Sequence, residues 1–115
     1  MWSESLECLP RDDLTELQLE RLRDLVGYVS EQVPFYRCTL ERARVGPADI
    51  RSLDDLNRLP FTTKNDLRDH YPFGMFAASL DAIVRTHASS GTTGQPTVAG
   101  YTQQDMTLRA ELMAR

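Results

Sequence analysis

A run of small polar residues interrupts the last third of the chain. Seven of the nine residues from 89 to 97 are Ser, Thr or Gly, and they lie between two β-prone segments, 82–88 and 97–101. β-branched side chains favour strands, and a Gly-containing connection favours a turn between them. A flexible linker is the alternative on composition, but linkers join finished domains, and this run lies inside what should be one domain. We therefore predict two strands joined by an ordered loop.

The same run has the chemistry of an anion-binding loop. Glycines can adopt positive φ and turn successive N–H groups toward one point, while hydroxyls add donors without bulk. Pro96 stiffens the exit from the loop. No Asp, Glu, Lys or Arg occurs from 86 to 104, and only His87 there could titrate near neutral pH. This pattern predicts a polyphosphate site, and its candidate residues are Ser89, Ser90, Gly91, Thr92, Thr93, Gly94, Gln95 and Thr97.

Two common phosphate loops do not fit this run. The loop of the P-loop NTPases needs glycines five apart followed by lysine, but Gly91 and Gly94 are three apart and no lysine follows. The dinucleotide fingerprint needs Gly-x-Gly, which is absent.

Helical patterns account for most of the preceding sequence. Apolar residues at helical spacing predict a helix that starts near Asp12 or Asp13 and ends before Pro34; they are Leu22, Leu25, Val26, Val29 and Val33. Thr15 and Gln18 have the spacing of a capping box. A second, shorter helix is predicted over 35–44.

Shorter helical segments follow. We predict a turn or two over 53–57, and a helix from Thr63, with Asp66 at its third position, to about His70. Thr102 with Asp105 opens a last helix. The predicted fold is therefore α+β, mostly helical, with a short two-stranded unit. Because two strands alone are marginal in water, we expect them to be part of a larger α/β fold.

Composition excludes several classes. The chain has 115 residues, a formal net charge of −4 and a pI near 5.1, whereas generic nucleic-acid binders are basic. Its apolar runs are too short to span a membrane, and residues 1–7 do not form a secretory signal. Cys8 and Cys38 are too few for a disulfide scaffold, which favours a cytoplasmic setting.

The loop 89–97 resembles the phosphate-binding signature of the acyl-adenylate-forming superfamily. Within it, the flanking segments 59–69, 71–74 and 98–102 resemble phenylacetate-CoA ligases, and Val-Pro-Phe-Tyr at 33–36 is similar as well. The resemblance spans about residues 9 to 115, with its motifs in the family's order.

The resemblance implies an amino-terminal piece of an AMP-forming acid–thiol ligase. Residues 1–80 would form a helical segment, and 81–115 would begin the AMP-binding domain. Such enzymes join an aryl acid, here phenylacetate, to ATP, release pyrophosphate, and pass the acyl group to coenzyme A. The loop would grip the β- and γ-phosphates, with Mg²⁺ on the phosphates. The resemblance also allows a homodimer of the complete enzyme.

Some residues depart from the family pattern. Gln95 stands where the family often has Lys, and His70 where it often has Asn; we expect His70 to be an exposed helix-end residue. The family's catalytic lysine lies in a different motif from Lys64, so we assign no catalytic residue and expect the chain alone to be inactive. We expect His87 to be packed or hydrogen-bonded rather than to contact a substrate or phosphate. We assign no role to Arg85. The alternative is a stand-alone, non-catalytic nucleotide-sensing or partner-binding module.

Overall fold

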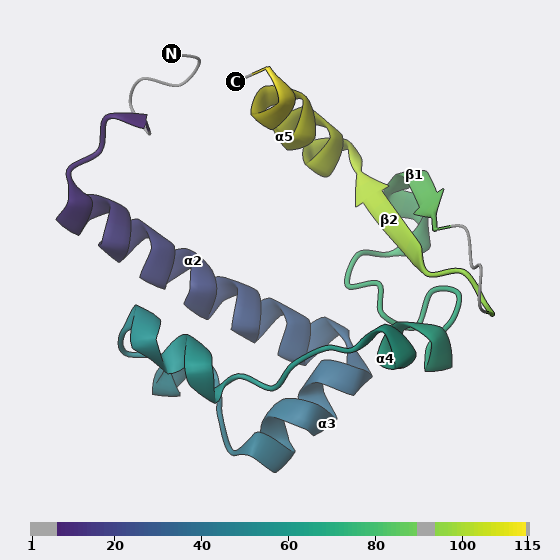
Figure 1. The fold of residues 1–115 in the computed structure, drawn as a ribbon, viewed down its shortest axis with the longest axis horizontal. Coiled ribbons are helices and arrows are strands. Elements are labelled where there is room, and N and C mark those ends of the chain that lie inside the picture. Colours follow the sequence, from purple (N-terminus) through teal and green to yellow (C-terminus); the bar gives the residue numbers. More distant parts are fainter. Residues whose placement is uncertain (1–6, 90–93, 115) are drawn as a thin grey trace. The chain divides into compact units, whose positions relative to one another are not determined.

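The computed structural model describes residues 7–89 and 94–114. They fall into two compact units, Met1–Pro60 and Phe61–Arg115, whose elements are labelled in Figure 1. The predicted division into segments 1–80 and 81–115 concerns function and stays a prediction. The chain is mostly helical with one two-stranded antiparallel sheet, as predicted.

The described part of the first unit contains the α-helices α2 (Arg11–Gln32) and α3 (Pro34–Ala43), followed by the 3-10 helices η1 (Pro47–Asp49) and η2 (Leu53–Arg58). Its core is small and entirely aliphatic. Five side chains are buried there: Val26, Val33, Leu40, Val45 and Ile50. Arg23 ties α2 to the end of η1, since its Nε donates to the carbonyl oxygen of Ile50 at 2.6 Å.

Proline sets both ends of α2. Pro10 is the N-cap, and its carbonyl accepts the first helical bond from the Leu14 N–H at 3.0 Å. Pro34 has no N–H to continue the helix and becomes the first residue of α3 instead. The predicted capping by Asp12 or Asp13 was wrong, because both lie inside the first turn. The predicted capping box at Thr15 was wrong too.

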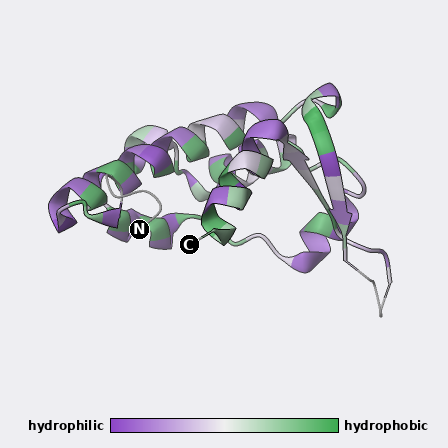
Figure 2. Ribbon diagram, turned by 90° about the horizontal axis from the view of Figure 1, so that it is seen from above, coloured by the Kyte–Doolittle hydropathy of each residue, from purple (hydrophilic) through white to green (hydrophobic). Residues whose placement is uncertain are grey.

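The hydroxyl of Thr15 donates to the Arg11 carbonyl oxygen, four residues back, at 2.8 Å. The predicted apolar stripe is correct at its buried end, where Val26 and Val33 lie in the core. It is wrong at Leu25, which is 56% exposed. Figure 2 shows hydrophobic and hydrophilic residues interspersed along the helices. The apolar periodicity of α2 therefore predicted only some of the buried residues.

The second unit contains α4 (Lys64–Asp69), the 3-10 helix η3 (Leu80–Ala82), β1 (Ile83–Ala88), β2 (Val98–Thr102) and α5 (Gln103–Met113). The caps of both α-helices are those predicted. The N–H of Asp66 donates to Thr63 Oγ1, and the N–H of Asp105 donates to Thr102 Oγ1. None of the described residues of this unit is buried. Among the residues described, no helix is both long and apolar enough to cross a membrane.

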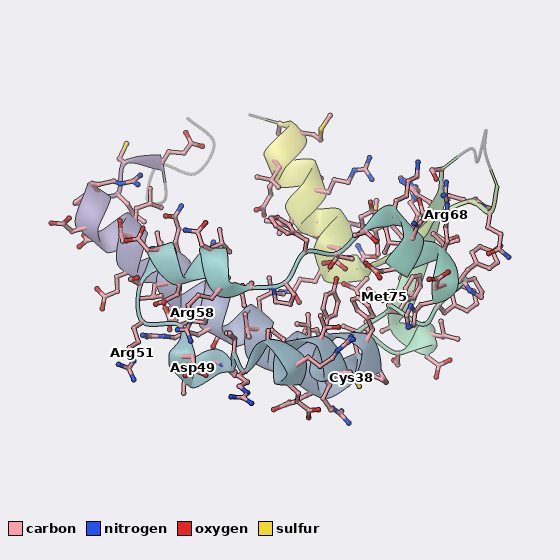
Figure 3. All side chains as sticks on the ribbon, turned by 60° about the horizontal axis from the view of Figure 1, so that its bottom comes forward. Cys38, Asp49, Arg51, Arg58, Arg68 and Met75 are labelled. Atoms are coloured by element: carbon pink, nitrogen blue, oxygen red, sulfur yellow. The ribbon has the colours of Figure 1, made fainter. Side chains whose placement is uncertain are left out.

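One acidic side chain closes the turn before η2 in the first unit. Asp55 Oδ2 accepts the N–H groups of Arg51 and Ser52 at 2.9 and 3.0 Å. Arg58 Nη1 lies 3.3 Å from Asp55 Oδ1 and donates to the Asp49 carbonyl. Asp49, Arg51 and Arg58 lie close together at one corner of the unit (Figure 3). The Arg51 N–H, then the Ser52 N–H, lower the pKa of Asp55 from 3.8 to about 2.

We therefore expect an acid-dependent loss of stability from this corner. Because the pKa of Asp55 is lower in the folded state, its ionised carboxylate stabilises the folded state above pH 3.8. This contribution is lost as the pH falls through about 2. Asp55→Asn should lower the melting temperature at pH 7 and flatten its fall between about pH 4 and pH 2. Thermal melts across that range test this, with Asp54→Asn at the exposed neighbouring position as control. Equal melting curves for the two variants would contradict the role of Asp55.

Candidate nucleotide phosphate site

The candidate site is the connection between β1 and β2. The two strands pair antiparallel, and His87 lies opposite Ala99, and Ala88 opposite Val98. An irregularity between Ile83 and Arg85 bends the start of β1. The predicted strands 82–88 and 97–101 therefore agree with the observed ones to within one residue at each end.

The base of the connection is closed by Ser89 and Thr97. The Ser89 N–H donates to the Thr97 carbonyl at 3.0 Å, and the Thr97 N–H lies 3.2 Å from Ser89 Oγ, which accepts from it. The two side-chain hydroxyl oxygens are 2.8 Å apart. These three contacts continue the ladder one pair beyond the strands and fix the width of the loop where it begins.

Four of the eight predicted binding residues are described by the structure: Ser89, Gly94, Gln95 and Thr97. Ser90, Gly91, Thr92 and Thr93 lie outside the described residues. Gly94 has a φ of +140°, and Gln95 beside it is exposed. Residues with a Cβ atom rarely adopt that φ, so this backbone conformation requires glycine at residue 94.

On one face of the sheet, β2 packs against an aromatic side chain, Phe76. Gly100 faces the ring of Phe76, and a Cβ at residue 100 would lie 2.7 Å from Phe76 Cζ. Only glycine allows this close approach. Phe76 also contacts Phe73, which lies in the segment 71–74, with ring centroids 5.3 Å apart. The turn thus supports the strand that leaves the loop.

The other face of the hairpin carries a cluster of His87, Tyr101 and Arg109. The rings of His87 and Tyr101 meet edge to face with centroids 5.1 Å apart. The Arg109 guanidinium, from α5, lies 5.5 Å from the centre of the Tyr101 ring, and its Nη1 is 3.3 Å from His87 Nδ1. His87 was predicted to be packed or hydrogen-bonded rather than a ligand; it is exposed, but it contacts Tyr101 and Arg109 as that prediction allows. The sequence did not identify Arg109.

Two further residues differ from or extend the sequence predictions. His70 caps the C-terminus of α4 as predicted, but it is half-buried rather than exposed, because its Nδ1 lies 2.8 Å from the Asp66 carbonyl and a tight turn follows. Lys64 is the exposed first residue of α4. The Thr63 hydroxyl, at 2.6 Å, and then the Thr63 N–H lower the pKa of Asp66, so its carboxylate holds this cap.

The described residues offer no metal centre. No group of three or more His, Cys, Asp or Glu side chains among them is placed to hold an ion. The described part of the loop also lacks a carboxylate. These donors do not fit a protein-held magnesium ion, which prefers carboxylate oxygens.

The chain has the fold of a segment of adenylate-forming CoA ligases. The chain superposes on 2-hydroxyisobutyryl-CoA ligase, solved with 2-HIB-AMP and CoA in the thioesterification state, with a TM-score of 0.84 and 34% identity. The match covers 93% of this chain and 24% of that one. An open conformation of the same ligase matches with a TM-score of 0.82 at 33% identity, again over 93% of this chain and over 26% of the other.

Sequence relatives define the family more narrowly. The chain is 57% identical over 115 residues to the phenylacetate-coenzyme A ligase of Thermus thermophilus, covering 100% of this chain and 26% of that protein. The ligase of Aromatoleum evansii is 51% identical, over 97% of this chain and 26% of its own length, and that of Escherichia coli is 49% identical, over 96% and 25%. No family model matches the chain.

The chain is therefore homologous over its whole length to a segment of phenylacetate-coenzyme A ligases, and it spans about a quarter of the relatives it matches. This confirms the resemblance found in the sequence.

Proposed function

We propose that this chain supplies the phosphate-binding loop of an AMP-forming phenylacetate-CoA ligase. A quarter of such a protein does not define the whole reaction, so the activity is inferred from the relatives and from the loop. The single observation that carries the proposal is the hairpin, closed by Ser89 and Thr97, whose connection is rich in Gly, Ser and Thr and free of charged residues.

The proposed reaction has two steps. A carboxylate oxygen of phenylacetate attacks the α-phosphorus of ATP, the bond to the β-phosphate oxygen breaks, and pyrophosphate leaves. The thiol sulfur of coenzyme A then attacks the acyl carbon, and AMP leaves. In the first step the loop would donate N–H and O–H groups to the β- and γ-phosphates, whose charge increases as pyrophosphate departs. Its role is positioning and charge dispersal, without covalent chemistry.

Gln95 gives this loop a neutral donor where the family often has lysine. Hydrogen bonds from charged donors are roughly twice as strong as those between neutral groups. We therefore infer that the loop relies on the number of its donors rather than on a cation. The described residues supply no catalytic acid, base or nucleophile, and we assign none. Mg²⁺ would need the phosphates and ligands outside the described residues.

The neighbouring 2-hydroxyisobutyryl-CoA ligase was solved with an acyl-AMP and CoA, which supports nucleotide and CoA use by the protein that contains this chain. Beyond the small-molecule substrates, we infer no nucleic-acid or membrane partner. We also infer a cytoplasmic setting, because two cysteines are too few for a disulfide scaffold. The homodimer of the complete enzyme stays a prediction.

A substrate-dependent exchange assay tests the function. The complete natural polypeptide should exchange labelled pyrophosphate into ATP when phenylacetate is present and should consume CoA thiol afterwards. A non-catalytic nucleotide sensor, the alternative, would bind ATP and catalyse no exchange with any aryl acid. Binding without exchange would therefore replace the ligase proposal with that alternative.

A further inference from the structure

Arg68, in the last turn of α4, buries part of its charged group. The residue is half-buried, and Figure 3 labels it on that helix. Its Nε atom is covered by protein, and no hydrogen-bond acceptor among the described residues lies within reach of it. A covered N–H group without an acceptor destabilises a folded protein, and more so when it belongs to a charged group. We therefore expect the complete protein to provide an acceptor at this position.

The two acidic side chains nearest to Arg68 in the helix do not provide that acceptor. Asp66 lies two residues before Arg68 and Asp69 one residue after it, and residues at these spacings do not face each other on a helix. The Asp66 carboxylate also accepts the N–H and the hydroxyl of Thr63, at 2.7 and 2.6 Å, and Asp69 is exposed. Within the part of the chain that the structure describes, Arg68 forms no ion pair.

The carbonyl groups at the end of α4 already have donors. The Asp66 carbonyl accepts the His70 N–H at 3.2 Å and lies 2.8 Å from His70 Nδ1, and the Arg68 carbonyl accepts the Tyr71 N–H at 3.1 Å. The turn that follows is tight, since a Cβ at residue 74 would lie 2.8 Å from the His70 carbonyl oxygen. The negative end of the helix dipole favours a cation in this turn, but it supplies no acceptor for Nε.

We propose that Arg68 binds an oxyanion that the described residues do not supply. A guanidinium only donates, and it stays charged at any pH of interest. Its Nε and one Nη atom present two parallel N–H groups, which match two oxygens of a carboxylate or of a phosphate group. The chain spans about a quarter of the relatives it matches, so an Asp or Glu outside the described residues is one source of the oxyanion, and the phosphate group of a ligand is the other. No residue from 89 to 97 belongs to this site, so its test is independent of the proposed loop.

Nitrogen NMR of the arginine side chains in the complete protein tests this site. The signals of Arg68 are those missing in Arg68→Lys or, if that variant does not fold, those that correlate with the Arg68 backbone. Rotation about the Nε–Cζ bond should be at least about tenfold slower than in free arginine, because a hydrogen bond to a charged group is worth about that factor or more. The Nε proton should also exchange slowly with water. Burial alone slows that exchange but does not fix the Nη groups, so the rotation rate decides.

Two buffer conditions distinguish the sources of the oxyanion. Slow rotation in a buffer without oxyanions would assign the partner to a carboxylate of the protein. Slow rotation only after inorganic pyrophosphate is added would assign it to a phosphate group. Fast rotation under both conditions would overturn the proposal, as expected if a water molecule serves Nε alone. Asp69→Asn, at the exposed acid next to Arg68, is the control: slow rotation should persist in it, and its loss would place the partner within α4 and also overturn the proposal.

Discussion

Replacing Gly94 by Val in the complete protein is expected to slow adenylation by about a hundredfold or more. Gly94 has a φ of +140°, a conformation that β-branched residues adopt only under strain. Valine at this position would force a different backbone conformation at the end of the loop, which under our proposal would misdirect its N–H donors. Losing one preorganised donor to a developing anion costs about a hundredfold or more in rate.

The structure separates this backbone effect from simple crowding. A Cβ at residue 94 would meet no atom within 4 Å among the described residues, so crowding against those residues does not account for a loss of activity, whereas the φ of +140° does. Gly94→Ala should therefore already cause much of the loss. We expect the same direction for Gly91→Val from the sequence pattern, because Gly91 belongs to the same predicted loop.

Matched controls make the Gly94 prediction specific. Gly27→Ala places a Cβ 3.5 Å from Pro47 Cγ, an ordinary contact, at a helical glycine of the first unit. Lys64→Ala removes an exposed side chain from the start of α4. Both should retain near-normal exchange rates. If Lys64→Ala and Gly94→Val slow exchange equally, the loop does not have the role assigned to it.

Local sequence signals predicted those parts of the fold that depend on neighbours along the chain. The caps at Thr63 and Thr102 were predictable because a hydroxyl and an acid three residues apart satisfy each other's backbone groups within one turn. The hairpin was predictable for a similar reason, since β-branched segments flank a run that favours a turn. The base contacts of Ser89 and Thr97 then follow from the strand register.

Features that depend on distant residues could not be predicted in this way. Leu25 fits the apolar stripe of α2 but is more than half exposed, whereas Val26 and Val33 of the same stripe are buried. Arg109 is separated from His87 by 22 residues and contacts it only because α5 turns back along β2. The sequence held one weak signal for this contact. Arg109 lies about two turns after the cap at Thr102, which places both residues on the same face of α5.

The 115-residue chain on its own is expected to show only background pyrophosphate exchange with phenylacetate, even if it binds ATP weakly. Its described residues hold the base of the proposed phosphate loop, and we assign no catalytic residue among them. None of the described residues of the second unit is buried, and apolar side chains such as Leu80 and Val84 remain more than half exposed. Two strands with so little covered apolar surface are marginal in water, so the loop base lacks the rigid support that electrostatic positioning requires.

The measurement compares the isolated chain with the complete natural polypeptide at equal concentration, with circular dichroism to verify helix content. Exchange by the isolated chain at a rate above background would show that catalytic groups lie within these residues, and would overturn the assignment of the chain as a phosphate-binding segment alone.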